Sequence, residues 1–250
     1  MFTVILLRTD SLTLTDFANC IQAANKVLAK WAPKWGIDAV VTADPAAKFD
    51  MAANVTDRNR HTSALGYHTV EAGVPTAYIS PSALLHNVYG TYTPAHWTAA
   101  LWNLLRTKIT RAAKQTSPAR YREGICSVLI HELMEMLADA HIDRLSKPDS
   151  LGLNWLVEVA DHVSGSYFIE VVNGINCVIP DATFPSYYDL NGKAPFSLNN
   201  SVTTPFATTT PTFYGYTKDV KGALLSIVKG SVHHLPRLQG VQLVPVVPQA

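Results

Sequence analysis

The chain has 250 residues, of which 48% are hydrophobic and 16% are charged, and its formal net charge is +1. Such a composition supports a sizeable buried core and argues against a largely disordered chain. Because no run or stripe of basic residues occurs, we expect no nucleic-acid partner.

The cysteine content and the N-terminus both predict a cytoplasmic protein. Cys20, Cys126 and Cys177 are odd in number and far apart in the sequence, which favours reduced thiols over a disulfide framework. The apolar run at residues 2–7 is too short for a signal peptide, and its basic residue, Arg8, follows the run. No stretch approaches the ~20 apolar residues of a membrane span, so we expect no membrane partner.

Hydrophobic periodicity in the first half of the chain predicts alternating strands and helices. The expected strands are 2–7, 38–43 and 76–79, and the expected helices are 15–33 and 95–107. Pro75, just before the third strand, suggests an edge position. Residues 44–65 are mixed and polar, which predicts a loop.

Residues 122–140 form the strongest predicted helix. Ile125, Leu129, Leu133 and Leu137 recur at helical spacing. The segment is apolar nearly all round, so the helix should be central.

The second half of the chain predicts shorter elements. Strands are expected at 155–159, 167–172 and 176–179, and a short helix at 221–229. After about residue 195, Thr, Pro and Asn become frequent. We therefore expect a domain at 1–195 and an irregular C-terminal arm at 196–250.

A metal-binding pattern lies on the central helix, in the run His131-Glu132-Leu133-Met134-Glu135. Residues four apart on a helix are neighbours, so His131 and Glu135 can close on one ion. Glu132, one step along, matches the general base of the zinc-peptidase helix. Glu135 takes the place of the usual second His, and a carboxylate can bind zinc but also opens the site to calcium, magnesium or manganese.

Glu158 and Asp161 are the candidates for a third ligand, because they follow the apolar run at 155–157. Glu158 as ligand with Asp161 supporting a ligand His is one assignment, and the reverse assignment is the other. His141, ten residues after His131, is a rival. On an unbroken helix it would lie about 15 Å along the axis and on another face, so it ranks below the two acids.

The plainer alternative is a satisfied network of buried hydrogen bonds, since a five-residue pattern is weakly specific. Burial favours a metal, because charges on so apolar a helix are costly unless they are paired or bound to a cation. Two further residues are candidates for the same cleft. Tyr167 could stabilise an oxyanion, although a strand Tyr more often packs in the core. His68 could line the cleft, although a surface position is the simpler expectation.

The chain resembles a group of uncharacterised zincin-like proteins of bacteria and tailed phages. The resemblance covers about residues 30–190. It is carried by four segments: Trp31-Ala32-Pro33-Lys34-Trp35-Gly36; Gly66-Tyr67-His68 with Gly73-Val74-Pro75; the run 127–139; and Glu158-Val159-Ala160-Asp161-His162-Val163 with Tyr167, Pro180 and Tyr187-Tyr188-Asp189.

The resemblance implies a zincin-like α+β domain with a mixed sheet and a central HExxE helix. It also implies a cleft bordered by an edge strand near 76–79, which would pair with extended substrate. His131, Glu132 and Glu135 correspond to the family's motif, and Glu158 and Asp161 to its downstream acids. Two departures stand out: Ala140 replaces a usual Pro, which would let the helix run on toward His141, and His162 also stands where Pro is usual.

Two functions follow as expectations. The first is a metal-dependent hydrolase of the metalloprotease type, acting on a peptide or protein, with zinc favoured and calcium the alternative. The second is a non-catalytic structural component of a phage particle, which keeps a degenerate zincin scaffold and associates with itself or with virion partners. The missing second His and the Thr/Pro-rich arm motivate the second reading.

Overall fold

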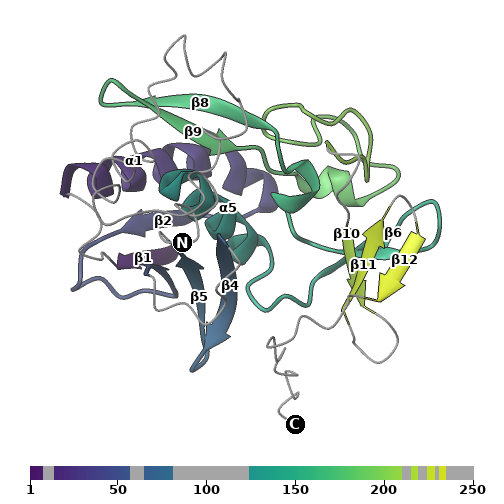
Figure 1. The fold of residues 1–250 in the computed structure, drawn as a ribbon, viewed down its shortest axis with the longest axis horizontal. Coiled ribbons are helices and arrows are strands. Elements are labelled where there is room, and N and C mark those ends of the chain that lie inside the picture. The colour runs from purple at the N-terminus through teal and green to yellow at the C-terminus, as the bar shows by residue number, and fades with distance from the viewer. Residues whose placement is uncertain are drawn as a thin grey trace, which may run out of the picture.

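The computed structural model describes residues 1–7, 14–56, 65–80, 124–209, 215–218, 224–228 and 231–234. Within these residues the chain forms a mixed five-stranded sheet with two helices packed on it, and three smaller sheets beside them (Figure 1). The predicted α+β class with a mixed sheet is confirmed.

The main sheet has the strand order β2-β1-β3-β5-β4. Its strands are β1 (Phe2–Leu7), β2 (Ala39–Thr42), β3 (Met51–Val55), β4 (Gly66–Glu71) and β5 (Val74–Ile79). All neighbouring pairs are parallel except β4 with β5, which form an antiparallel hairpin. The middle of β1 is buried continuously from Val4 to Leu6, as expected for a strand covered on both faces.

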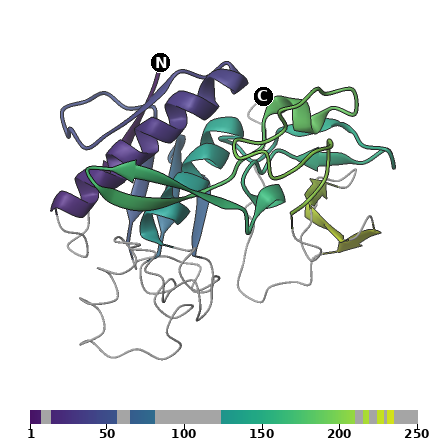
Figure 2. The ribbon, with the colours of Figure 1, turned by 90° about the horizontal axis from the view of Figure 1, so that it is seen from above.

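Both helices lie on the same side of the sheet and contact each other (Figures 1 and 2). Helix α1 (Leu14–Trp31) contacts β2, whereas α5 (Ile125–Ala138) contacts β3, β4 and β5. The sequence predicted helices over both segments, because their apolar residues recur at helical spacing. A short 3-10 helix, Ala32–Trp35, ends α1, and Gly36 follows it in the left-handed conformation (φ 68°).

The remaining strands form hairpins and a small sheet around this core. They are β6 (Leu145–Pro148), β7 (Asn154–Leu156), β8 (Tyr167–Val172), β9 (Ile175–Pro180), β10 (Gly215–Lys218), β11 (Leu224–Val228) and β12 (Ser231–His234). The β8-β9 hairpin contacts both helices (Figure 1). Two further 3-10 helices span Asp161–Val163 and Pro185–Tyr188.

Two sequence predictions about the sheet were wrong. Residues 44–65 were expected to be a loop, yet they contain β3, a central strand whose Ala and Asn residues have low strand propensity. The strand after Pro75 was expected at the edge, but β5 lies between β3 and β4. Pro75 is tolerated because pairing with β3 begins one residue later, at Thr76.

Three other predictions differ from the structure or fall outside it. The helix expected at 221–229 is strand β11 over its described part, where contact with neighbouring strands outweighs local propensity. The strand expected at 155–159 ends at Leu156. The helix expected at 95–107 lies outside the described residues. The division at residue 195 stays a prediction, and Phe196 and Val202 are buried in the same core as the helices.

The cysteines, far apart in the sequence, gather in the structure. All three are free and buried, and Cys126 on α5 lies beside Cys20 on α1 and Cys177 on β9. They occupy the contact of the two helices with the β8-β9 hairpin, where thiols pack as small apolar groups.

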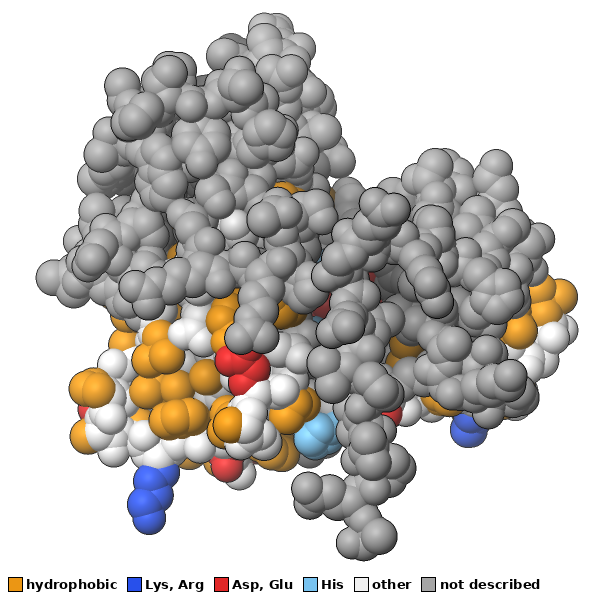
Figure 3. All heavy atoms as spheres, turned by 60° about the horizontal axis from the view of Figure 1, so that its bottom comes forward, with side chains coloured by type: hydrophobic (Ala, Val, Ile, Leu, Met, Phe, Trp, Pro, Cys, Tyr) orange, Lys and Arg blue, Asp and Glu red, His pale blue; other side chains and the backbone are white. Residues whose placement is uncertain are grey.

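The surface is sparsely charged where it can be seen. On the described part of the face in Figure 3, apolar and uncharged side chains predominate, and Lys and Arg side chains stand singly. Among the described helices, none combines the length and the apolar character that crossing a bilayer requires.

An ion-pair cluster ties α1 to the β8-β9 hairpin. Lys26 Nζ and Lys30 Nζ lie 3.3 Å and 2.6 Å from the two carboxylate oxygens of Glu170 on β8. Lys26 also donates a hydrogen bond to the carbonyl of Val171 (2.8 Å). The bond from Lys30, helped by that from Lys26, holds the pKa of Glu170 below its ordinary value of 4.5.

Replacing Glu170 by Gln should therefore lower the free energy of unfolding by about 0.5–1 kcal/mol at pH 7. Because the pKa of Glu170 is lower in the folded state, its stabilisation is present above pH 4.5 and is lost as the pH falls through the folded value. Urea unfolding of both proteins across this range measures the difference. Asp38→Asn is the control, since the exposed Asp38 side chain has no partner among the described residues. An equal loss at pH 3 and pH 7 would contradict the prediction.

Candidate metal centre

Helix α5 carries its polar residues on an otherwise apolar cylinder. Every residue from Ile125 to Ala138 is buried except His131, whose side chain is 22% exposed. Glu132 and Glu135 are only 6% and 4% exposed. Two buried carboxylates on one helix require partners, because an unpaired buried charge is costly.

His131 is held between two carboxylates. Its Nε2 lies 3.3 Å from Glu135 Oε1, one helical turn on, and 3.2 Å from Asp161 Oδ1. One ligand atom from each of these three side chains lies within 4.8 Å of the others. The sequence predicted that His131 and Glu135 face the same side, and the structure adds Asp161 to them.

Glu135 also fixes the loop that supplies Asp161. Its Oε1 accepts hydrogen bonds from the backbone N–H groups of Asp161 (3.2 Å) and Ala160 (3.4 Å). The other side of this loop is anchored by the fully buried Thr183, whose N–H and hydroxyl both donate to the carbonyl of Val159. The indole N–H groups of Trp31 and Trp35 donate in turn to the carbonyl of Thr183 (3.0 and 3.1 Å).

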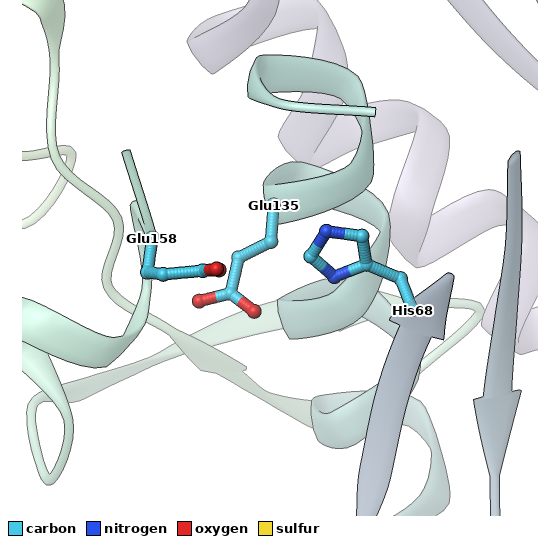
Figure 4. Close-up of side chains that lie close together, drawn as sticks. All are labelled: His68, Glu135 and Glu158. Carbon is cyan, nitrogen blue, oxygen red and sulfur yellow. The ribbon is translucent and has the colours of Figure 1, made fainter. Parts of the chain in front are cut away.

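A second group lies deeper and shares Glu135. It consists of His68 from β4, Glu135, and Glu158 from the loop, with one ligand atom of each within 4.8 Å of the others. Figure 4 shows the three side chains approaching one another from three different elements. Sequence reasoning expected His68 on the surface, but only 7% of it is exposed. The Gly66-Tyr67-His68 segment was the sequence signal that pointed to it.

Glu132 turns toward β4 and pairs with His68. Its Oε2 lies 3.6 Å from His68 Nδ1, while His68 Nε2 lies 3.3 Å from the carbonyl oxygen of Asp139. The strand comes close to the helix here because position 66 is Gly: a Cβ on Gly66 would stand 2.6 Å from Val128 Cγ1 and 2.7 Å from Glu132 Oε1.

The charges of the centre act strongly on one another. Burial raises the pKa of Glu158, and the charges of Glu135 and Asp161 add to this. Burial also raises the pKa of Glu135, and the charge of Asp161 adds to this while His131 opposes it. Burial opposes a charge on His68, but the bond to Glu132 and the nearby carboxylates raise its pKa to about 9. Likewise, the charge of Glu135 and the bond to Asp161 outweigh burial and raise the pKa of His131.

Asp161 differs from the other acids of the centre. Burial disfavours its charge, but the hydrogen bond and the charge of His131 together hold its pKa below the ordinary value. Among the described residues, no Lys or Arg side chain pairs with Glu132, Glu135, Glu158 or Asp161. Without a cation, protons must therefore offset the charge of these carboxylates.

Two candidates from the sequence stand apart from the centre. The helix was expected to run on toward His141, but it ends at Ala138 because the Asp139 carboxylate accepts hydrogen bonds from the N–H groups of Asp143 and Arg144. His141 is exposed and belongs to neither ligand group. Tyr167, half-buried at the start of β8, also belongs to neither group.

No protein-family model, no curated protein and no solved structure matches this chain. The resemblance to zincin-like proteins therefore stays a prediction.

The close approach at Gly66 generates a test of how the centre is built. Gly66→Ala should lower the free energy of unfolding by about 1–3 kcal/mol, because the new methyl group overlaps Val128 and Glu132. Chemical denaturation measures the loss. Val128→Ala removes the closest contact. In that background, Gly66→Ala should therefore lower the free energy of unfolding by less than it does in the wild type. A Gly66→Ala protein as stable as the wild type would show that β4 does not pack this closely on α5.

Proposed function

We propose that the protein is a metal-dependent hydrolase of the peptidase or amidase type, with a divalent cation held by His131, Glu135 and Asp161. The observation that carries the proposal is the convergence of these three side chains to within 4.8 Å. One imidazole nitrogen and two carboxylates are a donor set that zinc accepts.

The accessibility of this group also supports the proposal. The side chains of His131 and Asp161 are 22% and 29% exposed, whereas Glu135 behind them is 5% exposed. A catalytic cation needs an open position for water and substrate. Glu135 forms the buried side of the group, and His131 and Asp161 form the side that solvent reaches.

Glu132 is the proposed general base. A cation bound at this centre would lower the pKa of its water, so that a neighbouring carboxylate can accept the proton. Glu132 directly follows His131 on α5 and is held by His68.

The sheet supports a peptide substrate. The antiparallel edge strand beside the helix is β4, which takes the role that the sequence assigned to 76–79. The outer edge of β4 is unpaired among the described strands, and an extended peptide can add to such an edge by backbone hydrogen bonds. A zincin-like domain is the architecture that this combination of edge strand and metal helix favours.

Glu132→Gln is the central test. We expect it to lower peptide or amide hydrolysis by at least about 100-fold while the protein keeps its metal, because only the proton acceptor is lost. His131→Ala should lose the cation of this group and the activity together. His141→Ala is the matched control, since this exposed histidine lies outside both ligand groups.

Metal content by elemental analysis and turnover of a fluorogenic peptide library measure these outcomes. Undiminished hydrolysis in Glu132→Gln would refute the assigned base. A metal-loaded wild type that hydrolyses no peptide or amide would favour the structural phage-particle reading.

A further inference from the structure

Glu158 has no role in the proposed reaction, yet with His68 and Glu135 it forms a second group that has the composition of a ligand set. Its members are 7%, 4% and 8% exposed, so the group is more buried than the one around His131. The three side chains come from β4, α5 and the loop after β7 and face one another (Figure 4). Two acids and an imidazole require a strong reason to share so small a buried volume.

The orientation of His68 leaves one ring nitrogen for this group. Its Nε2 lies 3.3 Å from the Asp139 carbonyl oxygen, which can only accept a hydrogen bond. The Nε2 atom must therefore carry a proton, and in a neutral imidazole the Nδ1 atom then has the lone pair. That Nδ1 lies 3.6 Å from Glu132 Oε2, so the lone pair faces acids and needs either a proton or a cation. A carbonyl that fixes the tautomer of a histidine is typical of metal ligands.

Glu158 supplies an independent observation. Its side chain is more than nine-tenths buried, and its carboxylate has no hydrogen-bond donor and no ion pair among the described residues. Figure 4 shows this carboxylate directed at Glu135 and His68. Buried carboxylates are normally satisfied, so an unpartnered one that faces other ligands points to a cation.

Glu135 belongs to both groups, and its two carboxylate oxygens differ in their contacts. Its Oε1 makes all the contacts described above, which are with the His131 side chain and with the backbone N–H groups of Asp161 and Ala160. Its Oε2 makes no hydrogen bond or ion pair with any described residue. A carboxylate in this situation can bridge two cations, which in two-metal hydrolases lie about 3.5–4 Å apart.

We propose that the protein binds a pair of divalent cations bridged by Glu135, one with His131 and Asp161 and the other with His68 and Glu158. The first cation is that of the proposed function, on which this inference rests. Four carboxylates meet here, those of Glu132, Glu135, Glu158 and Asp161, and no described Lys or Arg pairs with them. Two divalent cations balance the four negative charges of these carboxylates, whereas one cation would leave two of them uncompensated.

Mn²⁺ tests this arrangement because its electron paramagnetic resonance spectrum changes when a second Mn²⁺ ion lies nearby. The full chain is stripped with chelator, loaded with Mn²⁺ and freed of excess ion, and its metal content and electron paramagnetic resonance spectrum are measured. The wild type should hold about two equivalents with an exchange-coupled spectrum, as a bridged pair requires. E158Q should hold about one equivalent and show the resolved hyperfine lines of an isolated Mn²⁺ ion.

The controls separate this inference from the proposed function. D143N alters an exposed carboxylate outside both ligand groups and should keep the coupled pair. D161N should keep about one ion, at the deeper group. If E158Q does not fold, as judged by circular dichroism, H68Q replaces it.

One equivalent in the wild type that E158Q retains and H131A loses would overturn the pair and leave the proposed function intact. One equivalent that E158Q loses and H131A retains would overturn the pair and the ligand set assigned to catalysis. Two uncoupled ions would overturn the bridge, and a wild type without metal would overturn both proposals.

Discussion

The carboxylate of Glu135 joins the two parts of the molecule that make the centre. It projects from the last turn of α5, and its Oε1 accepts hydrogen bonds from the backbone of the 158–161 loop while it also contacts His131. The loop that it holds carries Glu158 and Asp161. Without this interaction, a buried charge on the helix would be unpaired and the loop would lose its register against α5. Both ligand groups include Glu135 for this reason.

The sheet and the end of helix α1 both stabilise the contact between Glu135 and the loop. From one side, β4 reaches the helix closely enough for His68 to meet Glu132, which Gly66 allows by lacking a side chain. From the other side, Trp31 and Trp35 bind the Thr183 carbonyl, and Thr183 binds Val159 in the loop. The candidate ligands His68, His131 and Glu135 thus stand on a strand and a helix, and hydrogen bonds hold the loop that carries Glu158 and Asp161. The cluster of acids is costly to bury, and the surrounding apolar core supplies the stability that offsets this cost.

Three elements differ from the sequence predictions because hydrogen bonds in the folded chain outweighed a sequence signal. Strand β3 has the composition of a loop, yet it pairs on both sides in the centre of the sheet. Pro75 signals an edge, yet β5 is internal because Pro75 precedes the residues that pair with β3. The helix was expected to continue past Asp139, but that carboxylate accepts two backbone N–H groups and turns the chain. In the first two cases the deciding hydrogen bonds join strands that periodicity does not relate, whereas in the third they are local bonds to residues four and five positions along the chain.

The sequence by itself determined the α+β class, the helix over Ile125–Ala138 and the shared face of His131 and Glu135, because helical geometry relates residues four apart. It also narrowed the third ligand to Glu158 and Asp161 without separating them. Only the tertiary structure decided that Asp161 joins His131 while Glu158 joins His68, and that His68 is buried beside Glu132. Residue 68 lies on a strand and residues 158–161 on a loop, and their distance from α5 depends on how the sheet and the loop pack. No spacing along the chain encodes that distance, so it had to come from the folded structure.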